Sequence, residues 1–152
     1  MNIPIILIIL IVGTEGACMD GWVHYEDSCY LIGHTDLSFI DAQRYCQSHG
    51  ANLVNLETPK ENTFLKGYLS DLKDSKHWIG LTDEITEGVW KQYPSEELVT
   101  FTDWGTHQPN NGKTSNCAAY WESFGYHWVD EPCTSHYKAL CEMPFEAEHI
   151  VG

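Results

Sequence analysis

The sequence predicts an α+β fold, with two helices in the first half of the chain and short antiparallel strands in the second half. Two observations carry this prediction. Helix-capping residues precede two segments with helical apolar spacing, and the later segments are short apolar runs. A long polar stretch at residues 94–115 interrupts these runs, and a loop of that length in a compact domain is usually either functional or disordered.

Residues 1–17 are typical of a secretory signal peptide. The apolar run Ile3–Val12 is too short to span a bilayer as a helix, and small residues follow it. We expect cleavage after Gly16 or Ala17, secretion to the extracellular space and no membrane span. The alternative is a buried N-terminal strand or helix.

The first helix is expected over Ser38–His49. The Ser38 hydroxyl can cap its N-terminus, and Gly50 can end it. Four residues share one helical face and are expected to be buried: Phe39, Ala42, Tyr45 and Cys46.

A second helix is expected to begin at Thr58, which can act as its N-cap. Pro59 stands at the first helical position, and Glu61 has the spacing of a capping box. The predicted buried stripe consists of Phe64, Leu65, Tyr68, Leu69 and Leu72.

Short strands are expected at Ser28–Gly33, His77–Thr82, Val89–Tyr93, Asn116–Trp121, Tyr126–Val129 and Lys138–Met143. Three tryptophans in or beside these runs, Trp78, Trp90 and Trp128, are expected in the core rather than in a sugar-stacking platform, because aromatic side chains at strand centres dominate burial.

The charge balance excludes one class of partner. The chain has 8 Lys and Arg against 22 Asp and Glu, a formal net charge of −14. A nucleic-acid-binding protein needs a basic stripe to neutralise phosphates, and this sequence has none. An acidic surface suits an extracellular protein that binds cations or meets calcium-rich material.

A set of short motifs occurs in a fixed order along nearly the whole chain after the leader. It consists of Cys46, Trp78–Leu81, Gln108–Asn110, Cys117, Trp128–Asp130, Cys133 and Cys141–Glu142. In this order and spacing the set resembles the C-type lectin domain, here over residues 18–144, followed by a short acidic tail at 145–152. Among its members the chain most resembles single-domain secreted invertebrate lectins, including perlucin-like proteins of molluscs. The resemblance implies two helices flanking two small antiparallel sheets with a long polar binding loop.

Six cysteines follow the leader, and in a secreted chain an even number predicts a disulfide framework. Spacing alone does not choose among the pairings. The resemblance does, because the long form of the family has an added N-terminal hairpin with two extra cysteines. It implies the pairs Cys18–Cys29, Cys46–Cys141 and Cys117–Cys133.

The resemblance also implies a sugar site in which Gln108, Asn110 and Asp130 hold calcium, with the proline of the tripeptide in the cis form. Calcium takes oxygen ligands from carboxylates, amides and backbone, and sugar hydroxyls complete its shell in this family. Ser115 stands where the family has an acid, and Val129 stands where it has an asparagine. With Asp130 as the one anion, we expect weak calcium binding and loose sugar selectivity.

Five other residues complete the predicted sites. Asp83 and Glu87 match auxiliary calcium positions of the family, and Asn111 lies where a further metal ligand is common. Tyr126 and His127 are expected beside the loop as carbohydrate contacts. The alternative at both calcium sites is a solvated polar loop without an ion.

The sequence therefore predicts a secreted, non-catalytic protein that binds extracellular or microbial glycans, as in innate immunity, with help from calcium. The alternative is a calcium-independent lectin-like protein, or an acidic matrix protein, whose partner is another protein or a calcium mineral. An enzyme is not expected, because no Gly-x-Ser-x-Gly motif is present and the cysteines are expected to be paired.

Overall fold

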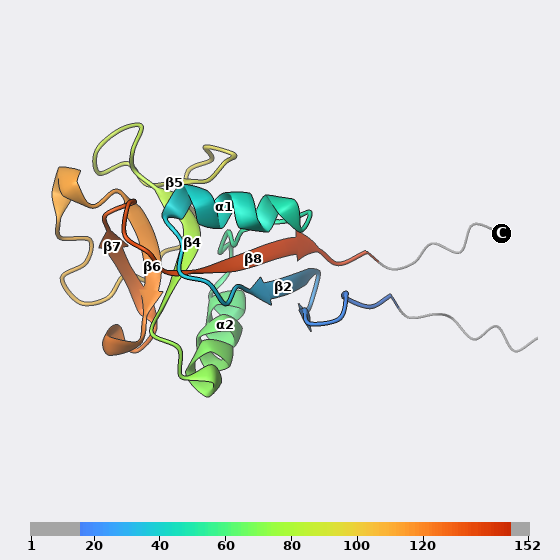
Figure 1. Cartoon of the computed structure of the whole chain (residues 1–152). Helices are drawn as coiled ribbons and strands as arrows, with labels where there is room; N and C mark the ends of the chain where they lie inside the picture. Colours follow the sequence, from blue (N-terminus) through green and yellow to red (C-terminus); the bar gives the residue numbers. More distant parts are fainter. Residues whose placement is uncertain (1–15, 147–152) are drawn as a thin grey trace, which may run out of the picture.

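The computed structural model describes residues 16–146 (Figure 1). Most of the predicted signal peptide and of the predicted acidic tail lies outside the described residues. The elements are β1 (Val23–Tyr25), β2 (Ser28–Ile32), α1 (Phe39–Ser48), β3 (Asn52–Leu53), α2 (Pro59–Leu72), β4 (Lys76–Thr82), β5 (Lys91–Gln92), η1 (Gly112–Thr114), β6 (Cys117–Trp121), η2 (Glu122–Phe124), β7 (His127–Glu131) and β8 (Lys138–Pro144). The predicted α+β class, with two helices, is confirmed.

The strands form a mixed sheet rather than two separate antiparallel sheets. The order along it is β1-β2-β8-β4-β6-β7, while β3 pairs with β8 and β5 pairs with β4. All pairs are antiparallel except β4 with β8, where His77 lies opposite Lys138. The prediction missed this parallel pair because β8 is long enough to contact β4 at its start and β2 and β3 further on.

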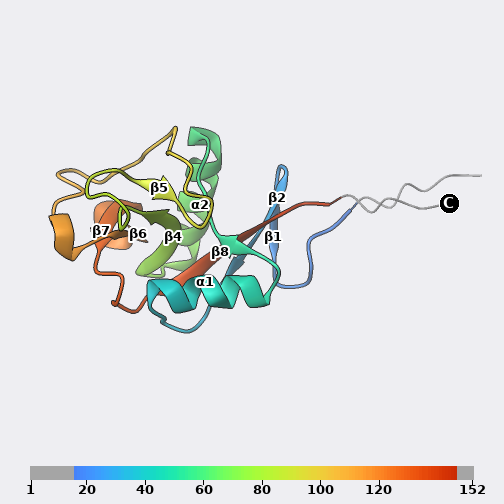
Figure 2. The same cartoon turned by 90° about the horizontal axis from the view of Figure 1, so that it is seen from above.

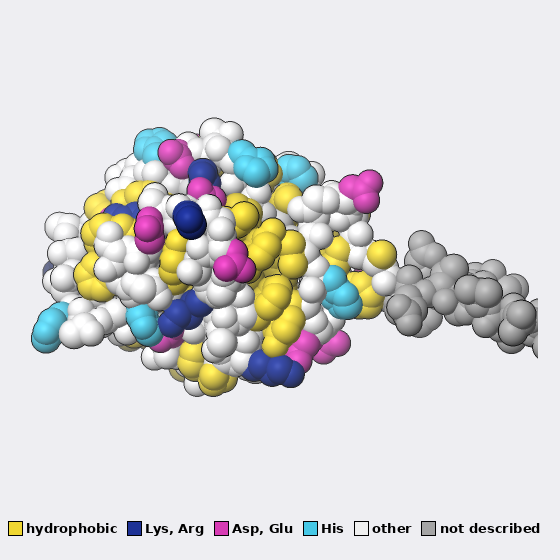
Figure 3. All heavy atoms as spheres, turned by 90° about the horizontal axis from the view of Figure 1, so that it is seen from below, with side chains coloured by type: hydrophobic (Ala, Val, Ile, Leu, Met, Phe, Trp, Pro, Cys, Tyr) yellow, Lys and Arg dark blue, Asp and Glu magenta, His cyan; other side chains and the backbone are white. Residues whose placement is uncertain are grey.

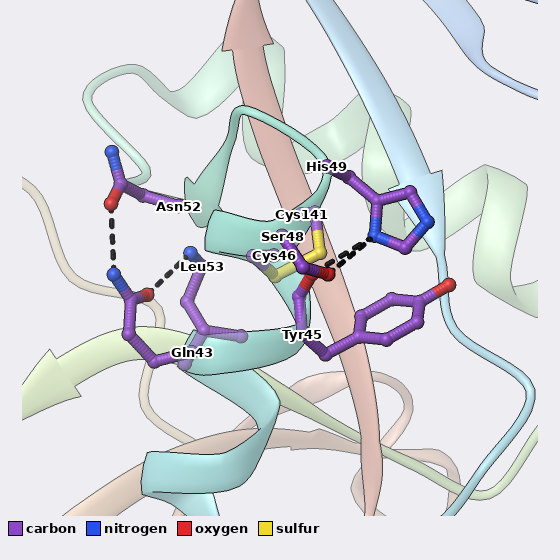
Figure 4. Close-up of a disulfide and its surroundings, with 8 residues drawn as sticks. All are labelled: Gln43, Tyr45, Cys46, Ser48, His49, Asn52, Leu53 and Cys141. Atoms are coloured by element: carbon purple, nitrogen blue, oxygen red, sulfur yellow. Dashed lines mark hydrogen bonds between the residues drawn. A yellow bond between two sulfur atoms is a disulfide. The ribbon is translucent and has the colours of Figure 1, made fainter.

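Helix α1 begins and ends where the sequence predicts. The Ser38 hydroxyl accepts a hydrogen bond from Asp41 N, and Gly50 adopts a positive φ of 74° just beyond the helix. Its buried face is Phe39, Ala42, Gln43 and Cys46, so Gln43 takes the place predicted for Tyr45. Gln43 bonds to β3 at both ends of its amide: Oε1 accepts from Leu53 N at 2.9 Å, and Nε2 donates to Asn52 Oδ1 at 2.8 Å (Figure 4).

Helix α2 is capped as predicted but buries a different stripe. The Thr58 hydroxyl accepts from Glu61 N, whereas the Glu61 carboxylate accepts from Glu57 N and not from the cap residue. The fully buried residues are Asn62, Leu65 and Leu69. Leu72 is 45% exposed, contrary to the prediction, because it is the last residue of the helix.

Partly buried aromatic side chains lie along α2. The Phe64 ring stacks on Tyr25 with centroids 4.0 Å apart and on Tyr68 with centroids 6.3 Å apart. Helix α2 lies at the bottom of Figure 1, and the view from below in Figure 3 shows hydrophobic side chains gathered on this face. These rings therefore extend the core outward and connect α2 to the N-terminal hairpin.

The core confirms the burial predicted for the three tryptophans. Trp78 and Trp128 are fully buried, and Trp90 is nearly so. Trp128 and Trp90 pack in one cluster with the aromatic ring of Trp104, and Trp78 packs in a second cluster, where its indole N–H donates to Leu37 O at 2.7 Å.

The three disulfides are those implied by the resemblance: Cys18–Cys29, Cys46–Cys141 and Cys117–Cys133. Cys46–Cys141 joins α1 to β8 (Figure 4). Cys18–Cys29 closes the N-terminal hairpin of β1 and β2. Phe145, predicted in the tail, stacks on His24 of this hairpin with ring centroids 3.9 Å apart.

The two ends of the described chain leave the domain on one side, and the long polar loop lies at the opposite end (Figure 2). Within residues 16–146, no helix has the length and apolar character needed to cross a membrane.

Candidate functional site

The polar loop is fastened to strand β7. Trp128 N donates to Asp103 O at 2.9 Å, and Gly105 N donates to Trp128 O at 2.8 Å. The Gln108–Pro109 peptide bond that follows is cis, as the resemblance implies. These bonds bring the tripeptide Gln108–Asn110 to the end of β7 that carries Asp130.

Asp130 organises the tip of this loop. It is 2% exposed, and its two carboxylate oxygens accept hydrogen bonds from Asn110 N at 3.0 Å and Asn111 N at 2.9 Å. Gln108 Oε1 accepts from Asp130 N at 3.4 Å. The structure therefore brings together the three residues that match the family's sugar site, Gln108, Asn110 and Asp130.

The two residues that depart from the family pattern, Ser115 and Val129, lie in different surroundings. Ser115 is buried and lines the same cavity as Asp130. Val129 is 1% exposed and packs in the core, where it lies opposite Ala119 on strand β6. An amide at position 129 would therefore enter an apolar cluster. Glu131 does not replace the ligands that are missing at positions 115 and 129. Its carboxylate accepts hydrogen bonds from Lys76 Nζ at 2.6 Å and from the Tyr137 hydroxyl at 2.9 Å.

One cavity joins the two predicted calcium sites. It has a volume of about 180 Å³, and its lining residues are Asp83, Glu87, Gly88, Trp90, Pro109, Gly112, Ser115 and Asp130. The carboxylates of the auxiliary site and of the sugar site thus face one space between the turn at 83–88 and the polar loop.

Asp83, which lines this cavity, has a buried oxygen, Oδ1, without a hydrogen-bond partner among the described residues. Asn116 Oδ1 is likewise buried and without a partner among these residues. The other oxygen of Asp83 accepts from Gly88 N at 2.9 Å, and Asp83 N donates to Asn116 O at 3.1 Å. Unpaired buried acceptors are costly, and oxygen donors of this kind are the ligands that calcium prefers. The residues present therefore fit a hard cation on the Asp83 side of the cavity.

Tyr126 does not lie at this site. Its side chain is buried, and its hydroxyl donates to Asp74 O at 3.0 Å. The sequence predicts Tyr126 as a carbohydrate contact from a strand over Tyr126–Val129, but the residue has a positive φ of 58° in the turn just before β7 and does not follow the strand pattern. Burial by its neighbours raises the pKa of Tyr126.

His127 belongs to a separate polar cluster. Its Nδ1 lies 2.7 Å from Asp103 Oδ1. The other carboxylate oxygen of Asp103, Oδ2, accepts hydrogen bonds from Asn62 Nδ2 at 2.6 Å and from Lys66 Nζ at 3.0 Å. Partial burial opposes ionisation of Asp103, but these hydrogen bonds hold its pKa below the ordinary value. His127 is three residues before Asp130, or roughly 10 Å along an extended strand. No sequence pattern predicts this cluster, because Asp103 lies in an irregular part of the loop.

The comparisons with known proteins agree with this geometry. The family model of the lectin C-type domain matches residues 35–143. A perlucin-like protein of Mytilus galloprovincialis is 28% identical over 145 residues, covering 89% of this chain and 92% of that protein. C-type lectin domain family 10 member A of Homo sapiens is 32% identical over 135 residues, or 85% of this chain, and the match spans 41% of that longer protein.

A solved structure has the same fold. The carbohydrate-recognition domain of the mouse scavenger receptor C-type lectin superposes with a TM-score of 0.79 at 28% identity, covering 87% of this chain and 100% of that domain. The matched region contains both helices, β4 to β8, and the loop with its cis proline. The chain belongs to the C-type lectin family.

Proposed function

We propose that the protein is a secreted, non-catalytic lectin that binds extracellular or microbial glycans at the tip of the polar loop, with calcium held in the adjoining cavity. The observation that carries the proposal is the cavity between Asp83 and Asp130, which Pro109 of the tripeptide also lines and which contains the unpaired buried oxygen of Asp83. Secretion follows the predicted cleavage after Gly16 or Ala17.

The residues around the cavity have distinct roles in this proposal. Asp83, Glu87 and Asn111 hold calcium on one side, and Asp130 fixes the loop that carries Gln108 and Asn110. When bound, calcium supplies a centre to which paired sugar hydroxyls can bind.

Gln108 and Asn110 orient the sugar through hydrogen bonds. Each side-chain amide can donate or accept, so the site does not impose one hydrogen-bond polarity on a sugar hydroxyl. We therefore expect weak and broad selectivity.

One observation favours a second function, binding of a protein or mineral partner without calcium at the loop tip. Both oxygens of Asp130 already accept hydrogen bonds from loop amides, so the loop keeps its shape without an ion. Val129 also lies in the core and adds no ligand. In that case the acidic surface would carry the interaction.

A glycan screen in calcium and in chelator tests the proposal. We expect binding in calcium, loss of binding in chelator, and at least about a tenfold weakening by Asp130→Asn, because this change removes a charge and one of two acceptors for the loop. Asp71→Asn makes the same charge change on the exposed surface of α2 and is the matched control. Unfolding curves of both variants check that the fold is intact. Glycan binding that survives both chelator and Asp130→Asn would favour the second function.

A further inference from the structure

We propose that Asn111 is a site of spontaneous deamidation, which converts the amide at the edge of the cavity into a carboxylate. The sequence Asn111–Gly112 lies in the exposed part of the polar loop. The reaction itself depends only on local chemistry. Its effect on calcium rests on the proposed function.

The reaction needs water and no other reagent. The backbone nitrogen of Gly112 attacks Cγ of Asn111, so that a new N–Cγ bond forms, the Cγ–Nδ2 bond breaks and ammonia leaves. Water then opens the cyclic imide. Cleavage of the new N–Cγ bond gives aspartate, and cleavage of the original peptide bond gives isoaspartate. Both products have the same composition, with one water consumed, one ammonia released and a net change of NH₂ to OH. The new carboxyl group is at Cγ in aspartate and at the former backbone carbonyl carbon in isoaspartate.

The attacking nitrogen is accessible at this position. Gly112 has no Cβ to hinder the approach of the backbone, and its φ is +48°. Among the hydrogen bonds of the described residues, none is donated by Gly112 N. Asn111, its neighbour, is the N-cap of η1 but makes no side-chain cap bond, so its amide group is free to react.

Two other asparagines, Asn110 in the same loop and Asn52 on β3, lack this combination. For Asn110, the attacking atom would be Asn111 N, which donates to Asp130 Oδ2 at 2.9 Å. For Asn52, it would be Leu53 N, which donates to Gln43 Oε1 at 2.9 Å in a buried position. The attacking nitrogen is therefore hydrogen-bonded for Asn110 and Asn52 but not for Asn111. Asn110, two residues before Gly112, serves as an internal control.

The turn at η1 controls the rate. Asn111 has a ψ of 9°, and its carbonyl accepts from Thr114 Oγ1 at 2.8 Å and from Thr114 N at 3.3 Å. Closure of the imide ring requires a more extended ψ, so the turn must first open. A three-residue 3₁₀ turn at the surface opens readily. A ligand that holds the loop closed should slow the reaction.

The product changes the charge of the cavity. Gly112 lines the cavity, and a Cβ added there would lie 3.7 Å from Glu87 Oε1, so the Asn111–Gly112 segment passes close to the carboxylates. A carboxylate at position 111 adds a negative charge beside Asp130. Calcium affinity rises with the charge of the ligands, so the aspartate form should bind calcium about tenfold more tightly. The isoaspartate form displaces the backbone and should bind less well.

Peptide mapping by mass spectrometry of the secreted protein, aged in mildly alkaline buffer, tests the proposal. We expect the mass change of NH₂ to OH at Asn111, faster than at Asn110 or Asn52, and slower when calcium is present. Asn111→Gln, which must close a larger ring, should abolish the change in that peptide. An Asn111 that stays intact while Asn110 or Asn52 reacts would overturn the proposal.

A second measurement separates this proposal from the proposed function. Calcium titration of Asn111→Asp should give about a tenfold lower Kd than Asn111→Gln, which keeps the charge of the native protein. Deamidation at Asn111 without any gain in calcium affinity for Asn111→Asp would overturn the link to calcium and count against the cation site, while the modification itself would stand.

Discussion

At the residue scale, two buried aspartates border the cavity in different environments. Both oxygens of Asp130 accept hydrogen bonds from loop amides, whereas Asp83 keeps one buried oxygen without a partner among the described residues. A cation gains most where an acceptor is otherwise unpaired. We therefore propose that Asp83, in the auxiliary site, is the stronger cation ligand of the two.

Asp83→Asn is therefore expected to weaken calcium binding more than Asp130→Asn. We expect at least about a tenfold increase in calcium Kd for Asp83→Asn, because the ion loses a charged ligand. Isothermal titration with calcium measures the effect, with Asp71→Asn as the control. An unchanged Kd in Asp83→Asn would show that the unpaired oxygen has no part in holding the ion.

Val129 gives a second prediction at this scale. Its side chain is 1% exposed and packs against the cluster that includes Ala119. Val129→Asn should lower the free energy of unfolding by about 2–4 kcal/mol, because an amide is buried without partners. It should not raise calcium affinity. Denaturant unfolding compares it with Val129→Ala, which loses apolar contacts alone. A stable Val129→Asn that binds calcium more tightly would contradict this account of the core.

At the scale of elements, local sequence signals correctly predicted the helix N-termini, which depend on local chemistry. Ser38 and Thr58 cap their helices as expected, since an N-cap needs only the next few residues. The strand expected at Val89–Tyr93 is reduced to Lys91–Gln92, because the segment before it forms the turn around Asp83. The sequence predicts burial of Leu72 because the apolar spacing does not show where the helix ends. The partners of His127 depend on tertiary packing, which the sequence pattern does not encode.

One buried side chain of α1 forms hydrogen bonds with β3. Gln43 is buried, and its Oε1 accepts from the backbone nitrogen of Leu53 (Figure 4). Gln43→Leu would leave that N–H buried without a partner. We expect it to lower the free energy of unfolding by about 1–3 kcal/mol, whereas Gln47→Leu, an exposed change on the same helix, should have little effect. Equal stability of the two variants in denaturant unfolding would argue against this bond.

At the scale of the whole molecule, two buried groups give the stability opposite pH dependences. Burial on β4 lowers the pKa of His77 from 6.5 to about 4, although Asp74, 3.5 Å away, acts in the opposite direction. The unfolded chain therefore binds a proton between pH 6.5 and 4 that the folded chain does not. Stability is lost as the pH falls through this window.

His77→Gln should remove this loss. For a shift of this size in a fully buried group, the expected contribution is on the order of 3 kcal/mol. The measurement is denaturant unfolding of wild type and variant at pH 7 and pH 4.5. If the variant loses as much free energy of unfolding between pH 7 and pH 4.5 as wild type does, the loss comes from groups other than His77.

Glu142 on β8 acts in the opposite sense. Burial, together with the charge of Glu61, raises its pKa from 4.5 to about 7, although its carboxylate accepts hydrogen bonds from Ser28 Oγ and Asn55 N. The folded chain holds a proton that the unfolded chain releases, so stability is lost as the pH rises from about 4.5 to 7.

Glu142→Gln should be more favourable for stability at pH 8 than at pH 4.5. This difference between the two pH values should be larger than for the exposed control Glu97→Gln. Thermal unfolding at the two pH values measures the difference. A Glu142→Gln variant that is less stable than wild type at both pH values would mean that the carboxylate is favoured in the fold.

In the proposed function, calcium in the cavity between Asp83 and Asp130 enables glycan binding at Gln108 and Asn110. The most direct test is the affinity of wild type for a glycan found in the screen, measured by surface plasmon resonance across a calcium titration with Asp83→Asn in parallel. We predict glycan binding that rises and saturates with calcium in wild type and is shifted to at least about tenfold higher calcium in Asp83→Asn. Glycan affinity that does not change between chelator and saturating calcium would contradict the claim.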